Sequence, residues 1–278
     1  MTVSDQSRIV AIVADTPIRR SDLWDFLVHT NGKQALENAI LDIGVTKELH
    51  RKGFVISKLD FERERELLVK TLQVVHFEEA LELLWSSQSL AKSHVNKLIE
   101  RNAGLRKLVS DDIKINDETI ERMFQILHGP SAEARIILCR TREEAHQANE
   151  ALQMGQRFKE VVAQYSTDNS RSNGGFIGEV IYADPQWPAS LREQLKPLNV
   201  GSNSTPFLLD KQWVIVSKES EIAPENITLE VVRTEVAEIA KRAQERLRMD
   251  QLSKQILQTY KPSIFDEALQ NSLSPNGY

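Results

Sequence analysis

The spacing of apolar residues changes twice along the chain and divides the sequence into three parts. Up to about residue 128, apolar residues recur mainly at three- and four-residue steps, which is typical of amphipathic helices. Between residues 130 and 220, short apolar runs alternate with turn residues and shorter helical segments. From Leu229 to Leu252 the helical spacing returns between charged residues. The pattern therefore predicts helices at both ends of the chain and a small mixed domain between them.

The N-terminal part is predicted to begin with a strand and to continue almost entirely as helices. Ile9–Ala14 is a β-branched run that Asp15-Thr16-Pro17 ends as a turn. Ser21-Asp22 is expected to cap a helix with Leu23, Phe26 and Leu27 on its apolar face. A second helix is expected after Gly32, with its end at Lys52-Gly53.

Further helix signals follow along the chain. Ser57 or Asp60 starts the next helix, two more are expected over residues 77–85 and 90–99, and Asn116 or Asp117 caps another. Gly129-Pro130 marks a domain boundary, because proline restricts the residue before it and ends helices. The long C-terminal helix is expected to end near Tyr260, followed by a short strand at Ser263-Ile264-Phe265 and a loose tail from 271 to 278.

The two helical ends are expected to form one noncontiguous module. A helical segment at each end, with a strand near each terminus, suggests that residues 1–128 and 222–270 pack together. Loop-closure entropy grows slowly with loop length, so inserting a whole domain between the two parts adds only a modest cost.

The middle part carries the most specific motifs. It opens with Ala134-Arg135-Ile136-Ile137-Leu138, continues through Tyr165-Ser166-Thr167-Asp168 and Asn173-Gly174-Gly175-Phe176-Ile177-Gly178, and closes with Gln212-Trp213-Val214-Ile215-Val216-Ser217-Lys218. In this order and at this spacing, the segment resembles a parvulin-type (PpiC-like) peptidyl-prolyl isomerase domain. The order of elements before it is similar to the N-terminal module of foldase-chaperones of the SurA and PrsA type.

The resemblance implies an α+β fold with three segments. Residues 1–129 would form a helical module and residues 130–220 an inserted parvulin-like α/β domain. Residues 221–278 would supply a long helix and a strand that pack back on the helical module.

The resemblance also implies a proline-binding site, with one major departure from the family. Two histidines normally lie beneath an acidic residue or a cysteine, and here their positions hold Ile136 and Val214. Leu209 replaces the polar residue five positions before the second histidine, and Asp168 matches the acidic position. The apolar pocket is carried over onto Ile177, Trp187 and Leu191.

Each of these residues has a structural alternative. Asp168 can equally cap a turn with Asn169 and Ser170. Ile177 and Leu191 can be ordinary core residues, which a small domain needs in any case. Losing both histidines together with the neighbouring hydroxyl exchanges a polar network for hydrocarbon, which favours a domain retained for shape or binding.

The sequence therefore leaves two functional hypotheses. The first is a foldase or chaperone that binds unfolded or proline-containing polypeptides in a helical cradle, with weak or lost isomerase activity. The alternative is an active peptidyl-prolyl cis-trans isomerase in which Asp168 and the apolar pocket suffice, because desolvating the amide lowers the rotation barrier.

Composition narrows the choice of partners. The 35 basic and 40 acidic residues are mixed along the chain without a basic stripe, which argues against nucleic acid as a partner. The single Cys139 forms no internal disulfide, and no metal-ligand spacing or cofactor motif is present, so neither a metal nor a cofactor is expected. A homodimer is left open.

The N-terminal residues bear on location. The first apolar run is too short for an export signal or a membrane span. The expected location is the cytoplasm for a full-length chain, whereas the resemblance implies the periplasm or cell envelope.

Overall fold

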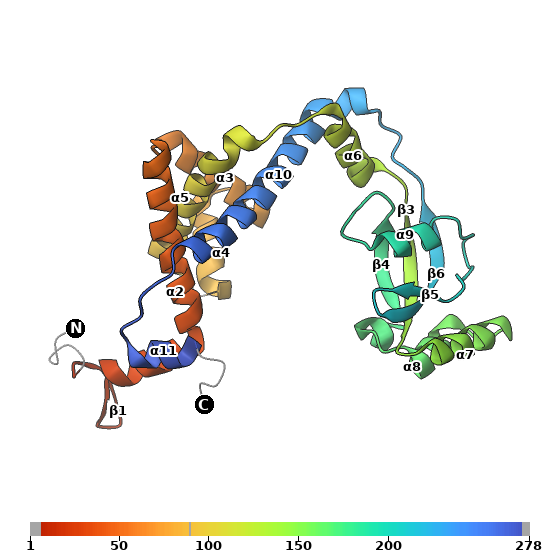
Figure 1. Cartoon of the computed structure of the whole chain (residues 1–278), viewed down its shortest axis with the longest axis horizontal. Coiled ribbons are helices and arrows are strands. Elements are labelled where there is room, and N and C mark those ends of the chain that lie inside the picture. The colour runs from red at the N-terminus through yellow and green to blue at the C-terminus, as the bar shows by residue number, and fades with distance from the viewer. Residues whose placement is uncertain (1–6, 89, 274–278) are drawn as a thin grey trace. The chain divides into compact units, whose positions relative to one another are not determined.

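The structure is a computed structural model that describes residues 7–88 and 90–273. Residues 1–6 lie outside the described residues, as does the end of the expected tail, residues 274–278. Mostly helical segments from both chain ends and a small antiparallel sheet confirm the predicted α+β class (Figure 1). Residue contacts divide the chain into two units, residues 1–114 with 242–278 and residues 115–241.

The first unit is a helical unit with a hairpin at its start. Its elements are the strands β1 (Ile9–Val13) and β2 (Thr16–Arg19), the helices α2 (Arg20–Lys52), α3 (Lys58–Leu72), α4 (Phe77–Gln88) and α5 (Lys92–Val109), the short 3-10 helix η1 (Ser110–Asp112), the second half of α10 (Leu229–Thr259), and α11 (Glu267–Leu273).

Three local expectations at its N-terminus are wrong. The predicted turn at Asp15-Thr16-Pro17 is shorter, because Ala14 and Asp15 take positive φ and Thr16 already pairs with Val13. The predicted pair of helices around Gly32 is one helix of 33 residues. One interior glycine costs a helix about 1 kcal/mol, which is too little to end it. The expected cap at Ser21-Asp22 is also wrong, because α2 begins two residues earlier than expected and its N-cap is Arg19. The Arg19 backbone N–H donates to the Asp22 carboxylate at 2.9 Å.

Other helix ends follow their sequence signals. Gly53 takes a left-handed conformation at the end of α2, as its position predicted. Ser57 caps α3, and its side chain exchanges hydrogen bonds with Asp60 in a capping box. Asn116 caps the helix that follows, accepting a 2.9 Å hydrogen bond from the Thr119 N–H.

Residues from the two chain ends share one hydrophobic core. Val45, Leu49, Leu105 and Leu108 from α2 and α5 pack with Met249 and Ile256 from α10. Gly44 makes this close approach feasible, since a Cβ there would lie 2.3 Å from Ile256 Cγ2. The noncontiguous module is thus confirmed. The strand expected at Ser263-Ile264-Phe265 is wrong, because these residues are irregular and α11 follows.

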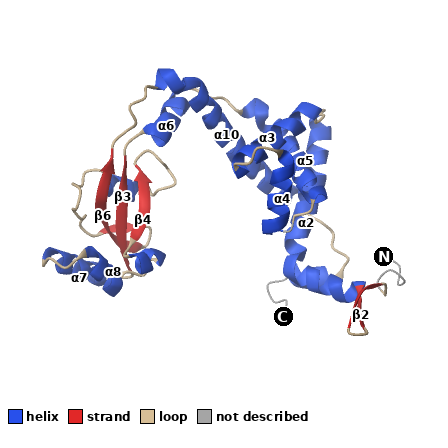
Figure 2. Cartoon of the chain, turned by 180° about the vertical axis from the view of Figure 1, so that it is seen from behind, coloured by secondary structure: helices blue, strands red, loops and turns tan. Residues whose placement is uncertain are grey.

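The second unit contains the sheet. Its elements are α6 (Asp117–His128), β3 (Ser131–Cys139), α7 (Arg142–Gln153), α8 (Phe158–Tyr165), the 3-10 helix η2 (Asn169–Asn173), β4 (Phe176–Ile181), α9 (Ala189–Leu195), β5 (Phe207–Leu209), β6 (Gln212–Ile222) and the first half of α10. The strand order is β4-β3-β6-β5, and each neighbouring pair is antiparallel. Figure 2 shows β4, β3 and β6 side by side in red.

The two faces of this sheet carry separate apolar clusters. On one face, Ile137, Cys139 and Ile215 pack with residues of α7 and α8. On the other face, Ala132, Ala134 and Val216 pack with Val180, Tyr182 and residues of α9. We call this second cluster the α9-side cluster. Alternation along β3 and β6 separates the two sets.

The glycine-rich segment fits tightly against β3. Gly175 has a φ of +78°, and a Cβ added there would lie 2.4 Å from the Ile136 carbonyl oxygen. The Gly175 carbonyl accepts a 2.8 Å hydrogen bond from the Ile136 N–H, and the β3–β4 register shifts between Ala134 and Arg135. Such a close backbone approach beside a bulge needs glycine.

The contact-based division does not coincide with the predicted segment limits. Helix α6 falls in the second unit, where Arg233 of α10 donates to Asp117 and His128 Nδ1 lies 2.8 Å from a Glu225 carboxylate oxygen. Strand β6 also continues to Ile222, which pairs with Ser131. The limits at residues 130 and 220 therefore remain a proposal for the inserted domain.

Candidate functional site

The α9-side cluster brings together four of the seven residues predicted for the site. Ile136, Ile177 and Trp187 are half-buried and pack against the cluster that contains the buried Leu191. They come from β3, β4, the loop before α9, and α9 itself. Residues far apart in sequence thus form one apolar surface on this face of the sheet.

The loop that carries Trp187 is fixed by an arginine of α9. Arg192 Nε donates to the Trp187 carbonyl at 3.0 Å, and its Nη1 donates to the Tyr182 carbonyl at 2.9 Å. One guanidinium therefore holds both ends of the 182–187 segment beside the cluster. The local sequence gave no signal for this role.

Ile136 and Val214 lie on the same face of neighbouring strands. Ile136 is opposite Val216, and Val214 is opposite Leu138, so the two residues are diagonal neighbours in the β3–β6 pair. Side chains at such positions are close enough for large groups to meet. Val214 is fully buried and lies opposite Phe207, which packs against the α9-side cluster.

Leu209 lies farther from this surface. It is the last residue of β5 and pairs with Gln212, outside the α9-side cluster. Alternation places it on the same side of β5 as Phe207.

Asp168 occupies the turn position that its structural alternative anticipated. Its carboxylate caps η2 by accepting a 2.7 Å hydrogen bond from the Ser170 N–H. The preceding residues attach the turn to β3: the Thr167 N–H donates to the Leu138 carbonyl at 2.8 Å, and the Leu138 N–H donates to Ser166 Oγ at 3.1 Å. Asp168 thus has a structural function, and a catalytic role for it remains a proposal.

Sequence reasoning missed a buried polar group at the edge of the same face. Lys218 is 2% exposed, and its ammonium donates to the Lys196 carbonyl at 3.0 Å and to Glu221 at 2.7 Å. The Tyr182 hydroxyl donates to the same Glu221 oxygen at 2.7 Å. The signal was available, because a lysine in phase with Val214 and Val216 falls on the apolar face of β6.

These contacts change two pKa values in opposite directions. Burial first, and then the hydrogen bond to Glu221, raises the pKa of Tyr182. Burial alone would raise the pKa of Glu221, but hydrogen bonds from Lys218 and Tyr182 outweigh it and lower that pKa. At neutral pH Tyr182 is therefore a neutral phenol, and Glu221 is a carboxylate that accepts hydrogen bonds from both Tyr182 and Lys218.

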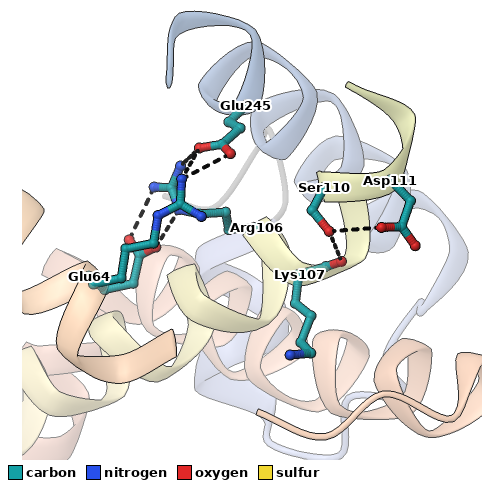
Figure 3. Close-up of polar contacts among 7 residues, drawn as sticks. Glu64, Arg106, Lys107, Ser110, Asp111 and Glu245 are labelled. Atoms are coloured by element: carbon teal, nitrogen blue, oxygen red, sulfur yellow. Dashed lines mark hydrogen bonds and ion pairs between the residues drawn. The ribbon is translucent and has the colours of Figure 1, made fainter. Parts of the chain in front are cut away.

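The helical unit contains a second polar group, buried between α3, α5 and α10. Arg106 donates to both Glu64 and Glu245, as Figure 3 shows. Arg63 adds a 3.1 Å hydrogen bond to Glu245, whose side chain is fully buried. Burial alone would lower the pKa of Arg106, but these carboxylates raise it.

The described residues contain neither a metal-binding cluster nor a membrane-spanning helix. Across residues 7–88 and 90–273, no cluster of three or more histidine, cysteine or acidic side chains is arranged as a metal site. Within the same ranges, no helix has both the length and the apolar character that a membrane span needs.

Comparison with known proteins agrees with the geometry of the second unit. Residues 135–220 match the family described as "Rotamase: PPIC-type PPIASE domain". This match covers β3 to β6, including the strands that carry Ile136 and Val214.

Longer similarities extend into the helical segments. The foldase protein PrsA of Bacillus subtilis is 24% identical over 211 residues, which cover 76% of this chain and 69% of that protein. The foldase protein PrsA of Clostridium botulinum is 22% identical over 214 residues, which cover 70% of this chain and 61% of that protein. The aligned part thus leaves about a third or more of each relative unmatched.

Among solved structures, the peptidylprolyl isomerase PrsA of Bacillus anthracis is similar to this chain. The two are 16% identical with a TM-score of 0.48, and the alignment covers 84% of this chain and 100% of that chain. From the sequence matches, residues 135–220 are a rotamase domain of the PPIC type, and the chain is a homologue of the PrsA foldases.

Proposed function

We propose that this protein is a foldase-type chaperone that binds unfolded or proline-containing polypeptides and has weak or lost isomerase activity. The PPIC-type domain and the homology to PrsA foldases support the foldase assignment. The nature of the face that carries Ile136 and Val214 supports weak isomerase activity.

One observation supports weak or lost isomerase activity. Prolyl isomerisation is limited by amide resonance, with a barrier of about 18–20 kcal/mol, and a catalyst must stabilise the twisted amide. Ile136 and Val214 place hydrocarbon on the diagonal positions that we assign to the histidines. Hydrocarbon supplies neither donors nor acceptors, so the electrostatic part of the stabilisation is missing.

The second candidate is an active isomerase with Asp168 as its polar group. We assign the proline pocket to Ile177, Trp187 and Leu191, with Ile136, Leu209 and Val214 as its apolar floor. The half-buried aromatic ring of Trp187 favours this candidate, because it is well suited to cover a proline. The capping bond from Ser170 to Asp168 weighs against it, since the carboxylate already has a partner.

Location and assembly belong to the same proposal. The sequence leaves two locations, and the similarity to PrsA foldases does not support the cytoplasmic one. We therefore assign the protein to the cell envelope or periplasm. Cell fractionation tests this assignment.

We also propose a homodimer through the hairpin and the start of α2, where Ile12, Val13 and Phe26 are each more than 60% exposed. Sedimentation equilibrium of the full chain measures the assembly state.

Two assays on the full chain test the main proposal. An aggregation assay with an unfolded client should show suppression at stoichiometric ratios. A protease-coupled assay with a prolyl peptide should show a rate far below that of a parvulin with both histidines. A rate equal to that parvulin's, abolished by Asp168→Ala, would establish the second candidate instead.

A further inference from the structure

The helical unit has an apolar groove that its own core leaves open. It lies between α3, α4, α5 and α10, and it encloses a volume of about 580 Å³. Leu67, Leu68, Leu84, Leu98 and Ile99 are among its lining residues. We call it the α3–α5 groove. Its size is within the range of pockets that take ligand side chains.

The charges at the α3–α5 groove are unequal in sign. Glu64 is the single acidic residue among those that line it, and Arg106, Lys70, Arg242 and Arg246 are the basic ones. Glu64 and Arg106 are already paired with each other, and Glu245 provides Arg106 with a second carboxylate. Of the remaining three cations, Lys70 and Arg246 are exposed and Arg242 is half-buried, and we call them the rim cations. Apart from Thr71 and Asn102, the rest of the lining is apolar.

These rim cations are poorly neutralised by the protein. In the part of the chain that the structure describes, no carboxylate lies at ion-pair distance from Lys70 or Arg242. Arg246 has one exposed partner, Asp250, at 3.5 Å. The whole chain has a formal charge of −5, so the sign of the charge at the groove is opposite to that of the chain as a whole.

We propose that the α3–α5 groove binds segments of polypeptide in which apolar side chains alternate with carboxylates. The inference rests on the proposed chaperone function and names the class of segment that this site selects. Leucine-rich walls would bury the apolar side chains, and the cations at the rim would face the carboxylates. An apolar groove alone attracts hydrophobic segments without regard to charge, whereas charge complementarity adds selectivity.

A pair of fluorescent peptides tests the selectivity on the full chain. Both contain the same apolar residues, alternating with glutamate in one peptide and with lysine in the other. Anisotropy at low salt should give about five- to tenfold tighter binding of the glutamate peptide, since two partly exposed ion pairs contribute that much. The preference should shrink as salt is raised, because salt screens exposed charges.

Three variants locate the site. Lys70→Glu combined with Arg242→Glu should remove the preference for the glutamate peptide. Two acidic substitutions on exposed lysines away from the groove, Lys254→Glu on α10 and Lys114→Glu, change the net charge equally and should leave the preference intact. Thr71→Trp, at an exposed position in the groove, should weaken the binding of both peptides, because the indole ring fills the groove. Circular dichroism of each variant confirms that the helices are retained.

The outcomes separate this inference from the proposed function. Equal binding of both peptides, or a preference that the groove double variant leaves unchanged, would overturn the inference. If the full chain still suppresses aggregation in that case, the chaperone proposal stands and its client site lies elsewhere. Tight binding of decanoate with no competition from either peptide would also overturn it, because the groove would then be a fatty-acid site.

Discussion

At the scale of single residues, the decisive positions are Ile136 and Val214. They are diagonal neighbours on one face of β3 and β6, and Val214 is completely buried. A polar side chain introduced at one of them would lack a partner, whereas polar side chains at both would be able to reach each other. The two positions should therefore be energetically coupled.

Restoring the histidines measures that coupling. Ile136→His alone should lower the free energy of unfolding by about 1–3 kcal/mol, since it brings a polar ring without a partner into the α9-side cluster. Adding Val214→His should recover part of the loss, and a double-mutant cycle by urea denaturation quantifies it. Strictly additive losses would show that the two side chains do not meet. Asp168→Ala in the native chain should change the isomerase rate little.

A second residue-scale prediction concerns Cys139, whose side chain is completely buried on the α7 and α8 face. Burial raises the pKa of its thiol from 9.0 to about 11. The folded state keeps its full stability below pH 9, where the thiol is protonated in both the folded and the unfolded chain. As the pH rises towards about 11, the thiol ionises more readily in the unfolded chain, so the folded state loses stability relative to it. The unfolding free energy should therefore decline over that interval.

Urea titrations at several pH values check the decline in stability. Cys139→Ala serves as the control, because its stability should fall less steeply between pH 9 and 11. An identical slope in both proteins would contradict the assignment. The native thiol should also react with a thiol reagent at pH 8 only as fast as the domain unfolds.

The sequence predicts well which apolar residues pack on one face of the sheet, whereas their role in a site stays a prediction. Ile136, Ile177, Trp187 and Leu191 meet as the resemblance implied, because alternation along strands fixes which residues share a face. The group of Tyr182, Lys218 and Glu221 was not predicted. The alternation along β6 already indicates that Lys218 lies on the apolar face, but its partners Tyr182 and Glu221 depend on contacts between elements that no local pattern encodes.

At the scale of elements, the fit of the glycine-rich segment against β3 is testable. Gly175 and Gly178 both have positive φ, but only Gly175 approaches the backbone of Ile136. Gly178→Ala should cost about 1 kcal/mol, from its conformation alone. Gly175→Ala should cost more, because the new Cβ also displaces β3. Thermal unfolding of both variants measures the difference, and equal losses would contradict the tight fit.

Helix ends were more predictable than helix continuity. Ser57, Asn116 and Gly53 cap or end helices as expected, since capping depends on a few adjacent residues. The continuity of α2 through Gly32 was missed, because a single unfavourable residue is outweighed by the rest of a long helix. The strand expected at 263–265 rested on three residues alone, which is too short a signal to be specific.

At the scale of the whole molecule, the inserted domain should be separable from the helical unit. The strands β3 to β6 and the helices α7 to α9 enclose their own two apolar clusters. A fragment of residues 130–222, which includes the end of β6, should therefore unfold cooperatively in urea. A fragment without a cooperative transition would contradict the proposed limits.

The same fragment locates the chaperone activity. Because the α3–α5 groove belongs to the helical unit, the fragment should suppress client aggregation much less than the full chain at equal molar ratio. Light scattering of a chemically unfolded client makes this comparison. Equal suppression by the fragment would place the activity in the inserted domain.

The bond between Arg106 and Glu245 also has a consequence for the order of synthesis. Helices α3 and α5 leave the ribosome long before α10. During that time Arg63 and Arg106 lack the carboxylate of Glu245, with which both pair in the complete chain. A buried charge cluster short of one partner is costly, so we expect the early helices to pack incompletely while the inserted domain is being made. A protein cut short before Glu245 should therefore contain a folded inserted domain and an incompletely packed helical unit.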